Sequence, residues 1–248
     1  MNRIILIALS FCMASITFSQ IELGGDPPTA KEKKEEKKKK MEAKEFSSTS
    51  VYYEANWSYT TRNLSENEGL FADPLGERAN ETSLNTWSFS LGFRNQLNRF
   101  LSWSGGISFV RNGESYLYEQ PDTMFTYDTK YKYIGMPIKL YFNYGEDFKL
   151  LAGAGLMPQM FLQYRQDSEW RTMTNATDSE SFKTRSGYST FVVSALFSIG
   201  GEIKFSPRWS LYVMPEYRLQ ITDSYLVTDS YDHFARALGV NMGLTMKL

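Results

Sequence analysis

The sequence predicts an all-β fold, an eight-stranded antiparallel up-and-down transmembrane β-barrel that follows an N-terminal signal peptide and a charged tether. Three observations predict it. Eight segments after residue 49 alternate apolar residues with small or polar ones, which is the period of a β-strand. The connections between these segments are short and long in turn. Aromatic residues make up 15% of the chain although its mean hydropathy is -0.39, as expected when apolar residues are spread singly along strands.

The N-terminus has the features of an export signal. Arg3 supplies a positive charge, and the apolar stretch Ile4–Phe18 has the length of a signal peptide but is short for a membrane-spanning helix. Ser19 is a small residue of the kind that a cleavage site needs, so residues 1–19 are predicted to be the signal peptide; a retained anchor is the alternative. The one cysteine, Cys12, lies inside this segment, so we expect no disulfide and no thiol chemistry in the mature chain.

Residues 20–48 are predicted to be a periplasmic linker. Within it, Lys31–Glu45 consists almost entirely of lysine, glutamate and alanine and has no apolar face to bury. It could form a solvated helix through Glu–Lys pairs four residues apart. A solvated tether is one interpretation of this segment. An arm that contacts a periplasmic protein, the cell wall or anionic headgroups is the other.

Residues 49–248 are predicted to form the outer-membrane barrel. In the second segment, for example, Trp87, Phe89, Leu91 and Phe93 alternate with serine, glycine and arginine. The eight predicted strands are 51–59, 87–94, 101–109, 134–142, 150–164, 191–204, 211–219 and 238–248.

The lengths of the connections support a membrane barrel. Those after the even-numbered strands are short, and those after the odd-numbered strands are long and polar. Bacterial outer-membrane barrels have short periplasmic turns and long external loops. We therefore expect the outer membrane of a Gram-negative bacterium, with the N- and C-termini in the periplasm. The short connections are 95–99, 143–148 and 206–208, and the long ones are 61–83, 112–130, 166–187 and 221–235.

The less apolar stripe of each strand is predicted to face the lumen. It is made of Gly, Ser, Asn and Thr with a few charges, which suits a crowded eight-stranded interior better than a surface in water. Charges in such a lumen must pair or be hydrated, which indicates either a filled, closed barrel or a narrow conduit. The predicted lumen charge network consists of Glu54, Arg94, Lys139, Glu202, Lys204, Glu216, Arg218 and Lys247.

The more apolar stripe is predicted to face outer-membrane lipid. Aromatic residues near both ends of the strands are typical of the interfacial girdles of membrane barrels. Trp57 and Trp87 are expected at the outer rim, and Trp103 and Trp209 at the periplasmic rim. The predicted girdle consists of Trp57, Tyr59, Trp87, Trp103, Tyr164, Trp209 and Tyr217.

One central hairpin resembles a known family. The segment 133–144 (YIGMPIKLYFNY) followed by 150–156 (LLAGAGL) is similar to the PorT-type outer-membrane β-barrel family, which has a Y-x-x-x-P-x-x-x-x-Y-F strand, a short turn and an apolar G-x-G strand. The resemblance implies an outer-membrane barrel and, because some members are tied to type IX secretion, a link to that process. The matching residues are Tyr133, Pro137, Tyr141, Phe142, Gly153 and Gly155.

The sequence gives little indication of catalysis, cofactors or metals. The net charge of -1 and the lack of a nucleic-acid motif predict no nucleic-acid partner. The sole histidine, His233, is close to Asp229, Ser230 and Asp232, but these are near neighbours in one predicted loop and no motif supports a nucleophile. His233 is therefore expected to be a hydrated loop residue, and a barrel hydrolase is the least favoured alternative.

The function that these observations predict is a non-enzymatic structural or interaction component of the outer membrane. A small passive or gated channel is the main alternative. An extracellular ligand at the loops is a further expectation, because loops carry recognition. The aromatic residues of these loops either bind such a ligand or continue the strands above the membrane; they are Tyr116, Tyr118, Phe125, Tyr127, Trp170, Tyr225 and Tyr231.

Overall fold

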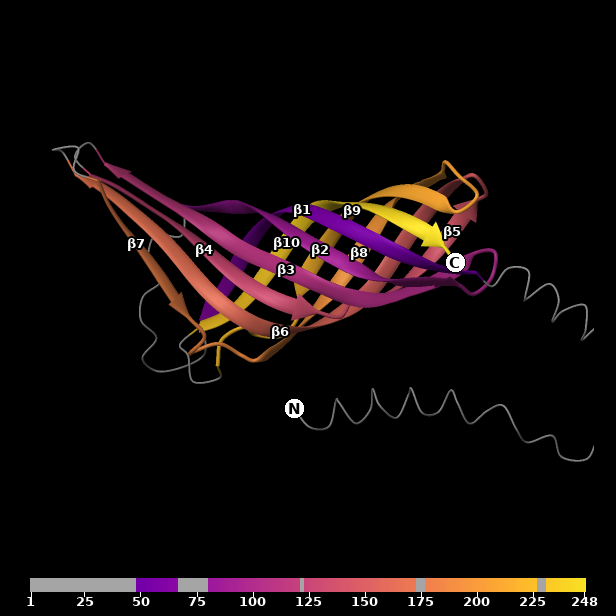
Figure 1. Cartoon of the computed structure of the whole chain (residues 1–248). Coiled ribbons are helices and arrows are strands. Elements are labelled where there is room, and N and C mark those ends of the chain that lie inside the picture. The colour runs from indigo at the N-terminus through magenta and orange to yellow at the C-terminus, as the bar shows by residue number, and fades with distance from the viewer. Residues whose placement is uncertain (1–47, 67–79, 121–122, 173–176, 227–230) are drawn as a thin grey trace, which may run out of the picture. The chain divides into compact units, whose positions relative to one another are not determined.

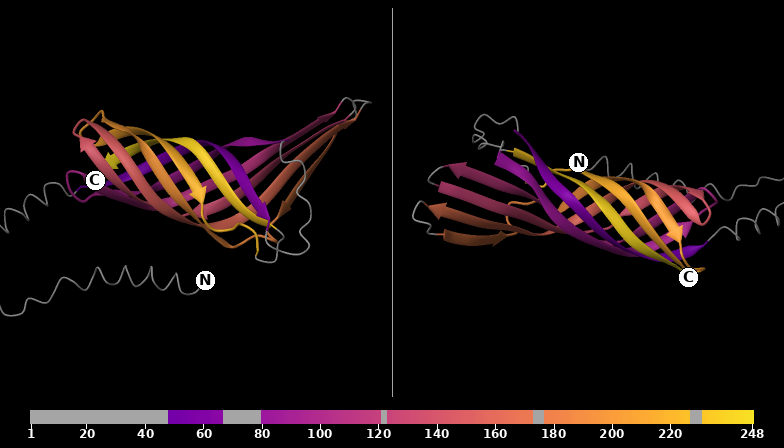
Figure 2. Two further views of the ribbon diagram at one scale, coloured as in Figure 1. Left: turned by 180° about the vertical axis from the view of Figure 1, so that it is seen from behind. Right: turned by 90° about the horizontal axis from the view of Figure 1, so that it is seen from above.

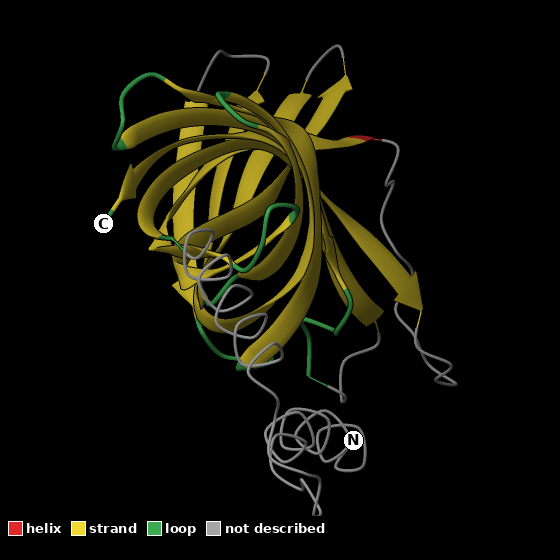
Figure 3. Ribbon diagram, turned by 90° about the vertical axis from the view of Figure 1, so that its right-hand side faces the viewer, coloured by secondary structure: helices red, strands yellow, loops and turns green. Residues whose placement is uncertain are grey.

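The computed structural model describes residues 48–66, 80–120, 123–172, 177–226 and 231–248. These residues form an antiparallel sheet of ten strands that closes into a barrel (Figures 1 and 3). The predicted signal peptide and the linker up to residue 47 lie outside the described residues. The part of the chain that the structure describes contains no helix long and apolar enough to cross a membrane. The strands are β1 (Thr49–Glu66), β2 (Glu81–Gln96), β3 (Leu101–Gln120), β4 (Thr123–Gly135), β5 (Ile138–Gly145), β6 (Phe148–Thr172), β7 (Thr177–Thr184), β8 (Phe191–Lys204), β9 (Trp209–Gln220) and β10 (Tyr231–Lys247).

The ten strands make eight barrel strands. β4 and β5 both lie between β3 and β6, so together they form one barrel strand with a break at Met136 and Pro137. Proline has no N–H group to donate to a sheet, and the break includes Pro137. β7 pairs with the far end of β6 and lies outside the closed barrel. The prediction of an eight-stranded antiparallel barrel is confirmed.

The first and last strands close the barrel. β1 pairs with β10 from Ser50 opposite Lys247 to Glu66 opposite Tyr231, and its other edge pairs with β2. Closure gives every barrel strand a hydrogen-bonded neighbour on both sides, as a strand in hydrocarbon requires. The C-terminus lies at the end of the barrel that carries the short turns between β2 and β3, β5 and β6, and β8 and β9 (Figure 1). We call this the short-turn end.

Four strands continue past the opposite end of the barrel. β6 has 25 residues, whereas about 9–11 residues suffice for a tilted strand to cross a membrane. The outer parts of β3, β4, β6 and β7 stay paired in one sheet, which we call the extension (residues 112–120, 123–131, 164–172 and 177–184). It projects beyond the other strands in Figures 1 and 2. Predicting loops over 112–130 and 166–187 was therefore wrong for most of these residues, which pair across strands.

The outward stripe of the barrel is apolar on every barrel strand. Along β2, Trp87, Phe89, Leu91 and Phe93 are between 40% and 58% exposed, while the serines between them are buried. A closed barrel that carries its large apolar side chains on the outside needs a hydrocarbon surrounding. The fold is therefore that of a transmembrane β-barrel.

Glycines of the inward stripe make room for tyrosine rings. A Cβ atom on Gly243 would lie 2.3 Å from Cζ of Tyr212, and one on Gly153 would lie 2.6 Å from Cδ1 of Tyr141. Such distances are far below van der Waals contact, so a larger residue would displace the ring. The alternation of glycine with apolar residues in these strands therefore serves the packing of an aromatic interior.

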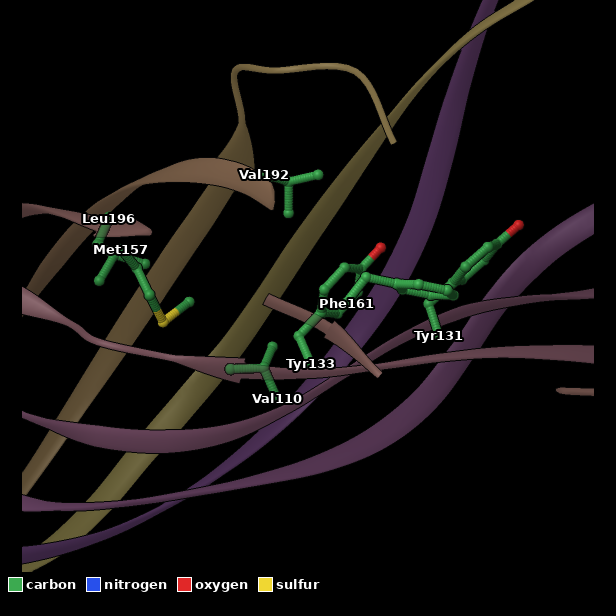
Figure 4. Close-up of a cluster of buried hydrophobic side chains, with 7 residues drawn as sticks. All are labelled: Val110, Tyr131, Tyr133, Met157, Phe161, Val192 and Leu196. Atoms are coloured by element: carbon green, nitrogen blue, oxygen red, sulfur yellow. The ribbon is translucent and has the colours of Figure 1, made fainter. Parts of the chain in front are cut away.

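The lumen has two layers of different chemistry. The layer toward the extension is an apolar plug of buried side chains, Val110, Tyr131, Tyr133, Met157, Phe161, Val192 and Leu196 (Figure 4). The layer toward the short-turn end combines the buried residues Tyr52, Tyr141, Leu151, Tyr212 and Met214 with charged groups. The sequence analysis expected small and charged residues throughout the lumen, whereas the first layer is apolar and aromatic.

Candidate functional site in the lumen and the strand extension

Lys139 of β5 is the centre of a buried ionic group. Its Nζ atom lies 2.5 Å from Oε2 of Glu216 on β9 and 3.6 Å from Oε1 of Glu54 on β1, and all three side chains are 5–6% exposed. Asn241 donates a hydrogen bond to Glu216 at 2.8 Å, and the hydroxyl of Tyr212 donates one to Glu54 at 2.9 Å. The group, which we call the ionic centre, joins strands from opposite sides of the barrel.

Arg94 forms a second ionic group nearer the short-turn end. Its Nη1 atom lies 2.8 Å from Oε2 of Glu202. The guanidinium carbon lies 4.7 Å and 4.8 Å from the ring centroids of Tyr141 and Tyr212, within the range of cation–π attraction. Because Tyr212 also donates to Glu54, its ring and hydroxyl link the two ionic groups.

The other three predicted lumen charges do not join a carboxylate among the described residues. Arg218 is buried and donates to the side-chain oxygen of Asn112 at 2.7 Å and more weakly to the carbonyl oxygen of Arg111. Lys204 and Lys247 are exposed and line a cavity at the short-turn end. The structure thus brings five of the eight predicted charges together and places two at the mouth of the lumen.

One predicted girdle residue, Tyr164, faces inwards and lies beside the apolar plug. Tyr164 packs against the plug, with its ring centroid 5.4 Å from that of Tyr131. A β-bulge at Leu162 causes this, because Tyr133 pairs with Phe161 while Lys132 pairs with Gln163. One extra residue exchanges the two faces of a strand. The assignment of Tyr164 to the lipid side was therefore wrong.

The remaining predicted girdle residues lie on the outward stripe. Trp57 pairs directly with Trp87 across β1 and β2, and the Trp57 ring lies 5.1 Å from that of Tyr59. Trp103 and Trp209 begin the strands that follow short turns, so they lie at the short-turn end. Trp87, Trp103, Trp209, Tyr59 and Tyr217 are all exposed. Their place at two membrane interfaces stays a prediction.

The sequence analysis expected His233 in a hydrated loop. This was wrong, because His233 lies inside the protein. It belongs to β10, is fully buried, and sits with its ring centroid 4.8 Å from Tyr131 and 5.0 Å from Tyr225. Its backbone N–H donates to Oδ1 of Asp223 at 2.7 Å. Asp229 and Ser230 lie outside the described residues. The prediction failed because β10 begins at Tyr231, so His233 is part of a barrel strand and not of the loop before it.

The extension has one aromatic face. Residues two apart on a strand share a face, so the pairing of Tyr131 with Tyr164 places Tyr127 and Phe125 of β4, and Trp170 of β6, on the face that continues from the lumen. The Tyr116 and Tyr127 rings stack with centroids 4.8 Å apart, and Phe125 lies 6.2 Å from Trp170. We call Tyr116, Tyr118, Phe125, Tyr127, Trp170 and Phe182 the aromatic face. All of these residues except Phe182 were named in the sequence analysis, and they continue the strands β3, β4 and β6, as one of the two interpretations expected.

The opposite face of the extension is polar and charged. Asp167 accepts hydrogen bonds from Arg165 at 2.8 Å, Ser181 at 2.9 Å and Lys130 at 3.2 Å. Burial alone would raise the pKa of the Asp167 carboxyl, but the three donors outweigh it and hold the pKa below its ordinary value.

The turn before β10 holds a second carboxyl with a shifted pKa. Burial raises the pKa of Asp223, and the nearby Asp232 raises it further. The backbone N–H groups of Tyr225 and His233 act in the opposite direction but do not outweigh these effects.

One ionic group was not predicted. Arg62 contacts Glu81 at 2.5 Å and Glu114 at 3.3 Å, and the Tyr131 hydroxyl donates to Glu114 at 3.1 Å. These residues fall in or near segments that the sequence analysis assigned to loops. Alternation along β3 places Glu114 on the lumen face. The sequence analysis missed it because the predicted strand ended at residue 109, whereas β3 continues to Gln120. Among the described residues, no three His, Cys, Asp or Glu side chains come together as a metal site.

Comparisons with known proteins name no family for this chain. No protein-family model matches the sequence, and no curated protein matches it either. Among solved structures, the chain is similar to Neisserial surface protein A (13% identity, 80% of this chain and 97% of that chain, TM-score 0.37). It is also similar to the outer membrane protein OprG from Pseudomonas aeruginosa (9% identity, 81% and 96%, TM-score 0.40). A third is Ail, the attachment invasion locus protein of Yersinia pestis (17% identity, 79% and 97%, TM-score 0.29).

Proposed function

We propose that this protein is a closed, non-enzymatic β-barrel of the Gram-negative outer membrane that presents the extension as a binding surface outside the cell. The observation that carries the proposal is the aromatic face. From Tyr131 of the plug to the far end of the sheet it runs without a break in register, so a half-exposed recognition surface is built on a packed interior. Large aromatic side chains are the usual anchors of binding sites.

Two buried layers support a closed barrel in preference to a channel. Val110 and Val192 in the plug and Tyr212 beside the ionic centre have no exposed surface. The lumen of an eight-stranded barrel is just wide enough for side chains to fill. We expect planar bilayers with the purified protein to show no conductance above background. Steady single-channel steps that persist in a Lys139→Met variant would support the channel alternative.

The orientation of the barrel can be tested with single cysteines. The only natural cysteine lies in the predicted signal, so the mature chain offers a clean background. Ser179 on β7 and Asp147 in the turn between β5 and β6 are both exposed and lie at opposite ends. We expect a membrane-impermeant maleimide to label Ser179→Cys on intact cells and to label Asp147→Cys only after the outer membrane is permeabilised. The reverse pattern would place the extension in the periplasm.

Binding at the aromatic face can be tested by photo-cross-linking on the same cells. A benzoylphenylalanine at Phe125 should form adducts with external molecules, because this residue belongs to the aromatic face. The same group at Thr126, the next residue along β4, faces the other side of the sheet and is the matched control. Equal adduct formation at both positions would remove the aromatic face from the proposal.

A link to type IX secretion is a separate proposal that rests on the hairpin resemblance. Packing accounts for three of its six residues: Tyr133 and Tyr141 are buried, and Tyr141 packs over Gly153. Deleting the gene in its own host and measuring export of type IX cargo tests the link directly. Unimpaired export would leave the motif as a feature of barrel packing.

We propose that Lys31–Glu45 reaches a periplasmic protein or the cell wall. The segment carries charge of both signs without an apolar face. Pull-down from mild-detergent membranes with the full chain and with this segment deleted tests the proposal. An unchanged set of partners would reduce the segment to a spacer.

A further inference from the structure

The short-turn end of the lumen opens into a cavity with an excess of positive charge. Its volume is about 160 Å³, which is room for several water molecules or one phosphate-sized ion. Five cationic side chains line it against two carboxylates. The cationic residues come from β2, β6, β8, β10 and the turn between β8 and β9: Arg94, Lys149, Lys204, Lys247 and Arg208.

Both carboxylates of the cavity already have partners. Glu202 pairs with Arg94 at 2.8 Å, and the exposed Glu146 lies 3.9 Å from Arg99, which is outside the lining. Within the described part of the chain, no carboxylate lies in ion-pair range of the four other cationic groups of the cavity. Mutually repelling cations around one small cavity favour an anion between them.

Arg94 gives an independent indication of a ligand. Its side chain is more than nine-tenths buried and lines the cavity, and its Nε–H group has no hydrogen-bond acceptor among the described residues. A buried donor without an acceptor is costly. Nε has almost no solvent-accessible surface of its own, so Arg94 would act on a phosphate in the cavity through its positive charge.

We propose that this cavity is a binding site for a small multivalent phosphate group that enters from the short-turn end. A divalent or higher anion fits better than a monocarboxylate because the cationic excess exceeds one charge. The tether segment does not offer the missing counter-charge, since Lys31–Glu45 has eight lysines against five glutamates. The phosphate can come from a soluble molecule or from a lipid headgroup at the rim of the barrel.

Pyrophosphate binding to the purified full-length mature protein tests the site. Calorimetry in zwitterionic detergent should show saturable binding that the Lys204→Gln, Lys247→Gln double variant weakens about tenfold, which is about 1.4 kcal/mol. These two lysines are exposed, so the variant should fold, as a heat-modifiable band on gels verifies. The control is Lys183→Gln with Arg185→Gln, which removes the same charge from the other end of the molecule and should leave the affinity unchanged.

Further measurements distinguish a soluble phosphate from a lipid headgroup, and a phosphate from a carboxylate ligand. If soluble phosphates are the ligand, pyrophosphate should bind equally in nanodiscs of phosphatidylcholine and of phosphatidylglycerol. If the headgroup is the ligand, phosphatidylglycerol should compete with it. The proposal is overturned if pyrophosphate fails to bind, if citrate binds more tightly than pyrophosphate, or if the control variant weakens binding as much as the double variant.

Discussion

Replacing Lys139 by methionine should destabilise the barrel more than any other single charge removal in the lumen. The substitution keeps a long unbranched side chain but removes the only cation within 4 Å of Glu54 and Glu216 in the described structure. Two carboxylates then share a buried site without compensation. At least one of them must take up a proton or draw water into the lumen.

The size of the effect follows from the burial of the three groups. All are 5–6% exposed, so water screens them little, and removing one partner of such a pair costs about 3–5 kcal/mol. A folded domain has a stability of about 5–15 kcal/mol, so the loss is a large fraction of the total. Neutralising the carboxylates as well, in Lys139→Met with Glu54→Gln and Glu216→Gln, should restore most of it, because glutamine can still accept from Tyr212 and Asn241.

Urea unfolding of the barrel refolded into lipid vesicles, followed by tryptophan fluorescence, measures these free energies. Lys132→Met on β4 is the matched control, since Lys132 is only half-buried and hydrogen-bonds Gln163 at 3.2 Å; a change within about 0.5 kcal/mol is expected there. A loss below about 1 kcal/mol for Lys139→Met with an unchanged slope, or a triple variant less stable than the single one, would refute the assignment of a tightly coupled ionic centre.

Three further predictions follow from packing, register and charge. Gly243→Ala should lower stability by about 1–3 kcal/mol in the same unfolding assay, because its Cβ would overlap the Tyr212 ring. Deleting Leu162 should remove the bulge and leave Tyr164 opposite Tyr131 in regular alternation, so proteolysis of the extension should stay as slow as in the unchanged protein; faster proteolysis would show that Tyr164 had turned outward. The bonds that lower the pKa of Asp167 should order β7 at neutral pH and weaken as the pH falls through that lowered pKa. Hydrogen exchange of β7 should therefore rise on acidification, and Asp167→Asn should remove the pH dependence.

The strand period allowed the barrel to be predicted from the sequence, together with the inward stripe that carries the residues of the ionic centre. Glu54, Lys139 and Glu216 fall on the inward parity of their strands, and an eight-stranded lumen is narrow enough to bring such groups together. Which cation pairs with which carboxylate depends on shear between strands, and parity does not contain this information. Arg218 shows the limit, because it is inward as predicted and yet meets Asn112 in place of a carboxylate.

The extension and the bulge could not be predicted for a physical reason. Both faces of the extension meet water or aromatic neighbours, so polar residues such as Asp128 and Asp167 interrupt the alternation that identifies a half-buried strand. The bulge at Leu162 adds one residue to β6 that has no partner in β4. It can therefore be recognised only once the pairing of β6 with β4 is known, and not from the β6 sequence. Aromatic residues on the inward parity of β4, Tyr131 and Tyr133, were the available signal for the plug.

The position of the plug explains why an extension of this length can be a defined surface. A sheet that leaves a barrel loses the hydrogen-bonded neighbours that closure provides, and short free ribbons are marginal in water. Here the inward face of the extension continues into Tyr131 and Phe161, which are packed on all sides within the barrel. The Arg62 group with Glu81 and Glu114 holds β1 and β2 against β3 at the same level. The barrel thus anchors the extension through its own core, so that filling the lumen and holding the extension in one sheet are two consequences of one packing arrangement.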